Sequence, residues 1–409
     1  HLHEHGWDCT VVCAGPGDYW VTDESLAQHV PGATEVIRVP GGSALSALLR
    51  LGRAGGGRRS GRAFGPLRRL SDWWLLPDSY VGWARRARRA AARRLSAGGI
   101  DAVLSSSPPD SVHLAARALR RPPGVPWIAD FRDPWIGLAF REPPTGWHRA
   151  RQAALERSVI ERADAVVVAS RTHQRTLGES SGARVTAERV YHVPNGFESD
   201  APGALAAAVA AETPADTVER PHFRLVFTGT LSLMPDTEVF LEAVHELLKH
   251  QAAGRRSLRV RLVGPYDSGY ADRAVALGLR GIVEFTGPLA HEESRRLQRD
   301  ADVLLLWKPR GTPTMVPGKL SEYLDTGRPI VALLEPGDEA AELAGRGGAE
   351  CVAPGNREAL AAVLERRWLA WREGVRPPRA RPAWLDQHRR DRLAESMAGI
   401  LDSLAEPRK

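Results

Sequence analysis

Short apolar runs alternate with amphipathic stretches along most of the chain. The apolar runs are four to six residues long, a typical length for buried strands, and the polar positions between them recur at helical spacing. This alternation is typical of strand–helix–strand units in a parallel sheet with helices on both faces. The sequence therefore predicts a doubly wound α/β fold. The clearest runs lie within 103–113, 126–135, 163–170, 190–196, 225–230, 260–264 and 283–288.

The alternation is interrupted once, which divides the chain into two expected domains. A chain of 409 residues exceeds one typical domain. Residues 200–222 are rich in Ala, Pro, Glu and Thr, so they predict a linker between an N-terminal domain, 1–199, and a C-terminal domain, 223–383. Apolar residues at helical spacing predict one final helix over 384–404, within a C-terminal segment 384–409.

The charge of the chain bears on its partners. The net charge is +7 and the pI is about 9.7, but there is no zinc-finger spacing, RNP-type aromatic motif or basic zipper, so we expect no nucleic-acid partner. Arg50–Arg94 holds thirteen arginines against two aspartates. Either this segment makes peripheral contact with an anionic membrane, or its arginines are solvated while its tryptophans pack inward or line a cleft. The aromatic residues interleaved with the arginines include Trp73, Trp74, Tyr80 and Trp83.

Metal, redox and membrane-spanning functions find little support. The sequence has no C-x2-C pair, no histidine cluster and no Asp-x-Asp pair after a strand, so we expect neither a metal nor a bound cofactor. Three scattered cysteines are typical of buried thiols in a reducing cytoplasm. No apolar run reaches the roughly eighteen residues that span a bilayer. We therefore expect a cytoplasmic protein, with membrane association through Arg50–Arg94 as the open alternative.

The most informative segment is 312–333. A loop rich in Pro and Gly ends at Gly318, and a short helix is expected to follow, with Lys319 and Glu322 on one side of it at i, i+3 spacing. Gly327 is placed to end that helix before an apolar strand, 330–333. The unpaired N–H groups of a helix start suit a diphosphate, Lys319 adds a point charge, and Glu322 can accept two sugar hydroxyls. The alternative is an ordinary helix cap before a buried strand.

This segment resembles the nucleotide-sugar site of the GT-B glycosyltransferases, specifically the retaining family 4. The order of the segments named above matches that family along nearly the whole chain. In the family, the second Glu of an E-x7-E motif holds the donor ribose, and Glu322 occupies that place, whereas Thr314 replaces the first Glu. The cations that often follow the glycine turn are absent here. The resemblance implies these donor-binding residues: Gly229, Thr230, Gly264, Thr314, Pro317, Gly318, Lys319, Leu320 and Glu322.

The resemblance also implies an acceptor side in the N-terminal domain. Asp130, Arg132 and Asp133 are expected after a strand, in the loop that in this family faces the transferred sugar, and with Lys319 they are the candidate catalytic residues. An Asp–Arg ion-pair network that fixes the loop is the alternative for the first three. His113 stands at a helix start, where a packing role is favoured over a catalytic one.

The fold implied by the resemblance is two Rossmann-like domains facing across a cleft, with the C-terminal helix crossing back onto the first domain. A plain helix of the second domain is the alternative. The strand at 8–13 corresponds to the family's second strand, so we expect that about twenty residues precede the sequence given. The implied activity is metal-independent, retaining transfer of a sugar from a nucleotide sugar to a hydroxyl of a glycan, lipid-linked saccharide or secondary metabolite. A nucleotide-sugar epimerase or hydrolase and a non-catalytic binding protein remain the alternatives.

Overall fold

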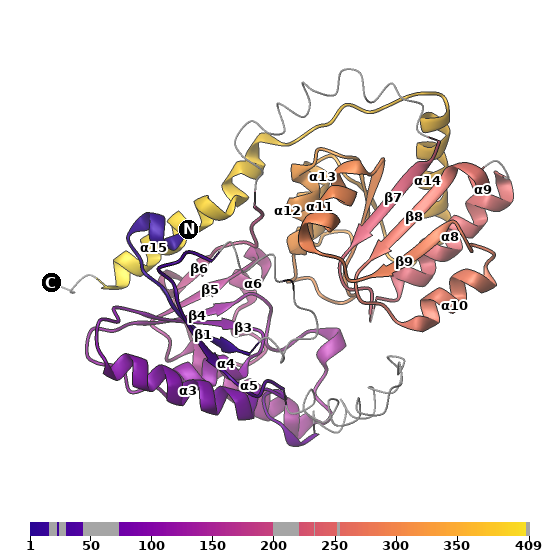
Figure 1. Ribbon diagram of the computed structural model, residues 1–409. Helices are drawn as coiled ribbons and strands as arrows, with labels where there is room; N and C mark the ends of the chain where they lie inside the picture. The colour runs from indigo at the N-terminus through magenta and orange to yellow at the C-terminus, as the bar shows by residue number, and fades with distance from the viewer. Residues whose placement is uncertain are drawn as a thin grey trace. The chain divides into compact units, whose positions relative to one another are not determined.

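The protein forms two compact units in a computed structural model (Figure 1), which describes residues 1–15, 23, 30–43, 73–198, 221–232, 234–251 and 254–405. The N-terminal unit comprises His1–Asn195 and Asp391–Lys409, and the C-terminal unit comprises Gly196–Arg390. Almost all of the predicted linker, 200–222, lies outside the described residues, as does the first half of Arg50–Arg94.

The N-terminal unit contains a parallel four-stranded sheet of order β3-β4-β5-β6 and a separate two-stranded parallel sheet, β1-β2. The strands are β1 Thr10–Ala14, β2 Glu35–Val39, β3 Val103–Ser107, β4 Trp127–Phe131, β5 Ala165–Val168 and β6 Val190–His192. The helices are η1 Leu2–His5, α3 Val81–Ser96, α4 Ser111–Arg117, η5 Ala139–Arg141, α5 Gly146–Ile160, α6 Arg171–Thr176, η6 Ala187–Arg189 and α15 Arg390–Ala405.

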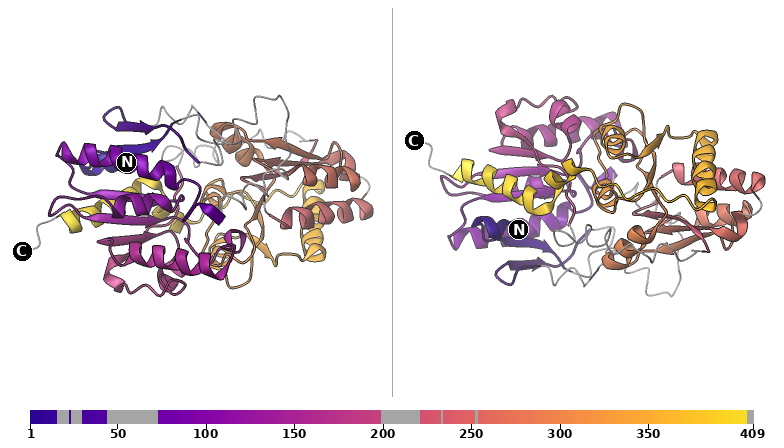
Figure 2. Two further views of the ribbon diagram at one scale, coloured as in Figure 1. Left: turned by 90° about the horizontal axis from the view of Figure 1, so that it is seen from below. Right: turned by 90° about the horizontal axis from the view of Figure 1, so that it is seen from above.

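The four-stranded sheet buries both faces, because successive side chains of a strand point to opposite sides. On β4, Trp127, Ala129 and Phe131 pack in the core with Val159 and Ile160 of α5. Ile128 packs on the other face, in a cluster with residues of α15. Figure 2 shows α15, in yellow, along this side of the sheet. Helices therefore cover both sides of the sheet.

The C-terminal helix α15 belongs to the N-terminal unit. Ile400 and Leu401 pack against β4 and β5, and Trp7 Nε1 donates a hydrogen bond to Asp402 Oδ1 at 2.9 Å. The prediction of one helix over 384–404 is wrong, because a 3₁₀ helix, η7 Ala383–His388, ends before extended Arg389. Leu385 of η7 is buried in the C-terminal unit, so tertiary packing divides a segment whose local spacing is helical throughout.

The C-terminal unit contains six parallel strands in the order β12-β11-β10-β7-β8-β9. They are β7 Phe223–Thr228, β8 Leu258–Val263, β9 Val283–Gly287, β10 Val303–Trp307, β11 Ile330–Leu333 and β12 Glu350–Val352. The helices are α8 Asp236–His250, α9 Gly254–Ser257, α10 Ser268–Ala276, α11 His291–Asp300, α12 Gly318–Asp325, α13 Glu339–Arg346 and α14 Arg357–Arg372, together with η7.

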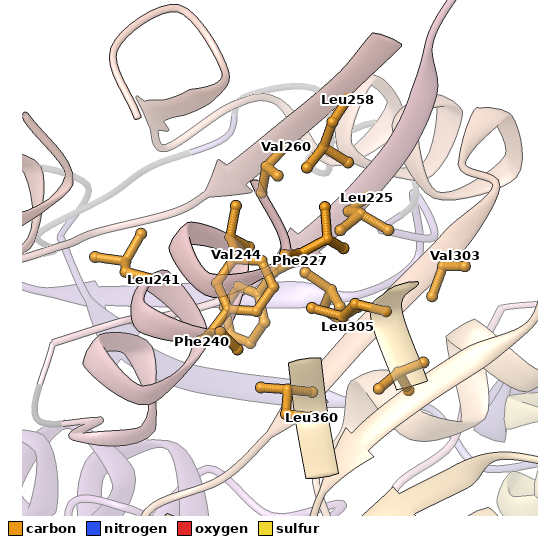
Figure 3. Close-up of a cluster of buried hydrophobic side chains, with 14 of the residues drawn as sticks. Leu225, Phe227, Phe240, Leu241, Val244, Leu258, Val260, Val303, Leu305 and Leu360 are labelled. Atoms are coloured by element: carbon orange, nitrogen blue, oxygen red, sulfur yellow. The ribbon is translucent and has the colours of Figure 1, made fainter. Parts of the chain in front are cut away.

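Both faces of this sheet carry a core. On one face Leu225, Phe227 and Leu305 pack with Phe240 of α8 and Leu360 of α14 (Figure 3). The alternate residues of the same strands pack with α11, α12 and α13 on the other face. The unit is thus doubly wound, as predicted. Because β7 pairs with both β10 and β8, the strand order reverses at β7, and ligands of such sheets bind at the carboxyl ends of the strands beside this reversal.

Two expectations about the whole chain can be compared with the described residues. No described helix is both long enough and apolar enough to cross a membrane. The three cysteines form no disulfide, but the prediction that they are buried is wrong, because Cys9 and Cys13 are partly exposed and Cys351 is exposed.

Candidate active site

The carboxyl ends of β7 and β8 meet backbone to backbone. Gly229 and Gly264 follow these strands with φ angles of 130° and 128°, a region that side chains other than glycine rarely adopt. A Cβ atom on Gly264 would lie 2.0 Å from the carbonyl oxygen of Gly229, so the two turns require glycine to approach so closely. The amide of Gly229 donates to Val263 O at 2.8 Å, which holds the turn against β8. Thr230 follows this turn and is exposed.

Lys319 lies at this edge of the sheet, in the first turn of α12. Its Nζ atom is 3.7 Å from the centre of the Phe227 ring, and a Cβ atom on Gly229 would be 3.1 Å from Nζ. Burial lowers the pKa of Lys319 to about 7, and the neighbouring Glu322 carboxylate offsets only part of that shift. Within the described part of the chain, no carboxylate forms an ion pair with this lysine. A poorly solvated amine without an acidic partner suits an incoming anion.

Glu322 is held by Gln298, a residue of another helix. Gln298 of α11 donates from Nε2 to Glu322 Oε2 at 3.3 Å and to Thr228 Oγ1 at 2.9 Å. The hydroxyl of Tyr323 accepts a hydrogen bond from Thr228 N at 2.7 Å. These bonds join the end of β7 to α11 and α12, and they leave the second oxygen of Glu322 available for a ligand.

The N-terminus of α12 has the form that the sequence predicts. Pro317 is its N-cap residue and provides no side-chain cap, and its carbonyl oxygen accepts a hydrogen bond from Leu320 N at 2.9 Å. The N–H groups of Gly318 and Lys319, which precede Leu320, are therefore the ones that can face a ligand. Thr314, Pro317 and Gly318 are partly exposed on the preceding loop. Leu320, the next residue of the predicted set, is buried in the core and anchors the helix.

Two other cations near α12, Lys308 and Arg310, have structural partners. Lys308 is buried, and its Nζ lies 2.8 Å from Asp338 Oδ2 and donates to the carbonyl oxygens of Thr312 and Met315 at 2.7 and 3.0 Å. Arg310 forms a bidentate pair with Asp236, at 2.5 and 3.0 Å. Both residues fix the loop before α12 by direct bonds.

The candidate residues of the N-terminal unit are placed differently from the prediction. Asp130 lies within β4, not after it, and accepts a hydrogen bond from Ser106 Oγ at 2.7 Å. Burial raises the pKa of Asp130 and of Asp133. Arg132 donates from Nε to the carbonyl oxygen of Ser107 at 3.3 Å, and among the described residues it forms no ion pair with either aspartate. The three residues follow one another in sequence but do not form the alternative Asp–Arg network.

The ion pair near these residues is formed by Asp110 and Arg141, neither of which the sequence pattern indicates as a site residue. Arg141 Nη2 lies 2.6 Å from Asp110 Oδ2, and burial raises the pKa of Asp110 to about 6 although Arg141 opposes the shift. Asp78 is adjacent and accepts hydrogen bonds from Ser111 N and Oγ. The only local feature that marks Asp110 in the sequence is its position as a short polar residue directly before α4.

His113 is a packing residue. It is fully buried, its ring lies 4.4 Å from that of Phe131, and its Nδ1 is 2.8 Å from Ser105 Oγ. Burial lowers the pKa of His113 to about 3, so the ring is neutral near pH 7. A neutral, enclosed ring fits the favoured prediction.

Family models match both units of the chain. A model described as Glycosyl transferase 4-like domain matches residues 1–196, and one described as Glycosyl transferases group 1 matches residues 222–368. This chain is a GT-B glycosyltransferase of the family 4 type. The transferases of this family belong to the EC 2.4 class. The second model covers the β7 turn, Gln298, Lys319 and Glu322 together.

Named relatives agree with this family. The D-inositol 3-phosphate glycosyltransferase of Kineococcus radiotolerans is 31% identical over 160 residues, a match that covers 36% of this chain and 35% of that protein. Anabaena Alr3699/HepE in complex with UDP-glucose is similar with a TM-score of 0.59 at 15% identity, over 96% of this chain and 99% of that one. Sucrose-phosphate synthase from Thermosynechococcus elongatus gives a TM-score of 0.63 at 14% identity, over 97% and 99%. Structural matches at identities this low establish the fold alone.

Proposed function

We propose that this GT-B chain transfers a sugar from a nucleoside-diphosphate sugar to a hydroxyl acceptor, with retention at the anomeric carbon. The observation that carries the proposal is the place of Lys319 at the start of α12, one turn before Glu322, with its Nζ 3.7 Å from the centre of the Phe227 ring and no ion-pair partner among the described residues. A diphosphate supplies the missing negative charge, and the ribose beside it supplies two hydroxyls for Glu322.

Retention fits a site that lacks a strong base at Thr314. In front-face attack, the leaving phosphate takes the proton of the acceptor hydroxyl, so the protein mainly positions groups and neutralises the charge that develops on the diphosphate. The α12 amides and Lys319 serve that purpose in the C-terminal unit. In the N-terminal unit, Asp130, Arg132 and Asp133 are the candidate acceptor-side residues, with Asp110 beside them.

The first substrates to test follow from the relatives. A structural neighbour is named as a complex with UDP-glucose, and a sequence relative is named as an inositol phosphate glycosyltransferase. Uridine nucleotide sugars are therefore the first donors, and phosphorylated or lipid-linked polyols are the first acceptors, followed by glycans and secondary metabolites.

Product analysis with a panel of nucleotide sugars tests the proposal. We expect a glycosylated acceptor and a free nucleoside diphosphate, and the anomeric configuration of the product, read by NMR, should match that of the donor. An epimer or free sugar would instead identify the epimerase or hydrolase alternative, and tight donor binding without turnover would identify a binding protein.

Activity is expected to persist after treatment with a chelator. The described residues contain no group of three His, Cys, Asp or Glu side chains that could hold a metal ion, and Lys319 with the α12 amides offers positive charge without one. The measurement compares turnover before and after EDTA and dialysis. Loss of turnover that magnesium or manganese restores would contradict this prediction.

Donor affinity is expected to fall as the pH rises above 7. The free protein holds Lys319 with a pKa of about 7, so its charged form is present below that pH and is lost as the pH rises through it. A donor that needs the charge takes up a proton on binding, which weakens affinity by up to about ten-fold per pH unit above 7. Calorimetry from pH 6 to 9, with the nucleotide sugar found active, measures this; a nucleotide sugar itself has no phosphate that titrates near pH 7.

Lys319→Arg is the matched control, because arginine stays charged throughout this range. Its affinity profile should be flat between pH 6 and 9. Equal slopes for the parent and Lys319→Arg would assign the pH dependence to another group.

We propose membrane contact as a second property, at the described part of Arg50–Arg94 and the start of α5. Trp73, Trp74 and Trp147 are 51%, 80% and 65% exposed. The ring centres of Trp73 and Trp147 lie 5.1 and 4.9 Å from the ring centre of His148. Exposed indoles and arginines are typical of surfaces that bind anionic lipids. The exposed arginines of α3 are Arg85, Arg86, Arg88, Arg89 and Arg93.

Trp83 does not share this role. It is buried, and its Nε1 donates to the carbonyl oxygen of Val39 at 3.0 Å. The alternative in which tryptophans pack inward therefore holds for Trp83, whereas Trp73 and Trp74 are exposed.

Binding to anionic liposomes is expected at low salt, with a fluorescence shift from Trp73, Trp74 and Trp147. Each basic residue near the surface contributes about 1 kcal/mol, so Arg88→Glu with Arg89→Glu should lower binding more than about ten-fold. Arg256→Glu, an exposed arginine on α9, is the control and should leave binding intact. A protein that stays in the supernatant at low ionic strength would contradict the proposal, and duplex binding with a steep salt slope would indicate nucleic acid instead.

A further inference from the structure

A second site is suggested by a cavity in the C-terminal unit, at the amino ends of β7, β8 and β9. The cavity has a volume of about 600 Å³, within the usual range for small-molecule sites. Its lining includes Arg224 of β7, Arg259 and Arg261 of β8, and Arg296 of α11. Lys319 and the glycine turns lie at the carboxyl ends of the same strands, so the cavity is separate from the donor site.

The strand register gathers three of these arginines on one face of the sheet. Arg224 pairs directly with Arg259 on the neighbouring strand, and Arg261 follows two residues later on the same face of β8. Val226 follows Arg224 by two residues on β7, so it lies on this face too, where it packs with Leu297 of α11. Helix α11 thus forms an apolar wall beside the arginines and also contributes to the basic lining.

The charges of this lining are not balanced. Two carboxylates, Glu284 and Asp300, line the cavity against four arginines, and a third carboxylate, Asp302, lies 3.9 Å from Arg224 Nε. The Arg261–Glu284 pair at 3.1 Å is exposed, and such pairs contribute little. Arg259 donates to the carbonyl oxygen of Leu258, and Arg296 forms no ion pair within the described part of the chain. Arg259 and Arg296 are therefore the two lining arginines without an ion pair among the described residues, and an anion beside them would be favourable.

We propose that this cavity binds a small organic phosphate at a site distinct from the donor site. Guanidinium groups bind phosphate oxygens in a bidentate manner, and the cluster presents several of them around one space. The apolar wall formed by Val226 and Leu297 suits the organic part of the ligand. The volume fits one small molecule, which favours a phosphorylated metabolite over a polymer.

Calorimetry with phenyl phosphate and with inorganic phosphate tests the proposal, on the full chain in the presence of saturating UDP. UDP occupies the donor site, so any remaining binding reports another site. We expect phenyl phosphate to bind with one-to-one stoichiometry and at least several-fold more tightly than inorganic phosphate. Equal binding of the two probes would overturn the organic part of the proposal, and no binding at millimolar concentration would overturn the site.

The double variant Arg259→Gln with Arg296→Gln should lower the affinity for phenyl phosphate at least ten-fold, because each charge-assisted bond contributes more than a neutral one. Arg256→Gln removes the same charge from an exposed position outside the cavity lining and is the matched control. An unchanged melting temperature establishes that the double variant folds. If affinity persists in the double variant, or falls equally in the control, the assignment to this cavity is wrong.

Discussion

Replacing Lys319 by alanine is expected to lower turnover by about 100-fold or more, and to raise the donor Michaelis constant much less. Loss of one positioned group that stabilises developing charge typically costs a factor of about 100 to 1,000 in turnover. The charge on the leaving diphosphate grows in the transition state, so the loss should appear mainly in that step. Lys319 meets this need because burial leaves its amine poorly solvated, with no acidic partner among the described residues.

Protein stability provides the control for this prediction. The pKa of Lys319 is about 7 in the folded protein, below the usual value of 10.5, so the unfolded chain binds more protons between these two pH values. Stability therefore rises with pH across that window, and a variant without the amine should not lose stability at pH 7. The melting temperature of Lys319→Met should therefore be no lower than that of the parent protein, while its turnover should be low, as for Lys319→Ala. A raised Michaelis constant with normal turnover would exclude the catalytic role.

The elements that follow from local spacing could be predicted from the sequence. Gly318 starts a helix, Gly327 with a φ angle of 65° lies just beyond its end, and Ile330–Leu333 forms a strand, as the Pro and Gly positions indicate. The helix expected at 384–404 failed because its division depends on where Leu385 packs. Local periodicity carries no information about which of two cores receives a side chain.

The candidate site shows the same limit. Lys319 and Glu322 could be selected because they stand in one short segment with a recognisable loop before it. Gln298 was missed because its hydrogen bond to Glu322 joins two residues that are 24 positions apart in sequence and lie on different helices. The ion pair of Lys308 could not be predicted, because the sequence shows the charge of Lys308 but not its partner, Asp338. A carboxylate within a strand whose other residues are buried is uncommon, which is why Asp130 was expected after β4.

Replacing Glu322 by glutamine is expected to weaken nucleotide-sugar binding about ten-fold or more. A carboxylate that accepts two ribose hydroxyls makes charge-assisted bonds, each typically contributing about 1.5–3 kcal/mol, and about 1.4 kcal/mol corresponds to a factor of ten. The introduced glutamine would keep the shape of the side chain and one acceptor oxygen, so the loss isolates the charge. Calorimetry with the active donor measures it, and unchanged affinity would exclude contact with the ribose.

The hydrogen bond from Gln298 to Glu322 gives this prediction a second, independent arm. Gln298→Leu removes the donor that holds Glu322 Oε2 at 3.3 Å, so the carboxylate loses its fixed orientation and donor affinity should fall by several-fold. If Gln298 acts through Glu322, the double variant should bind no more weakly than Glu322→Gln alone. The effects of substituting two residues that share one interaction do not add. Additive losses of affinity would therefore mean that Gln298 acts independently of Glu322, through Thr228 and the end of β7.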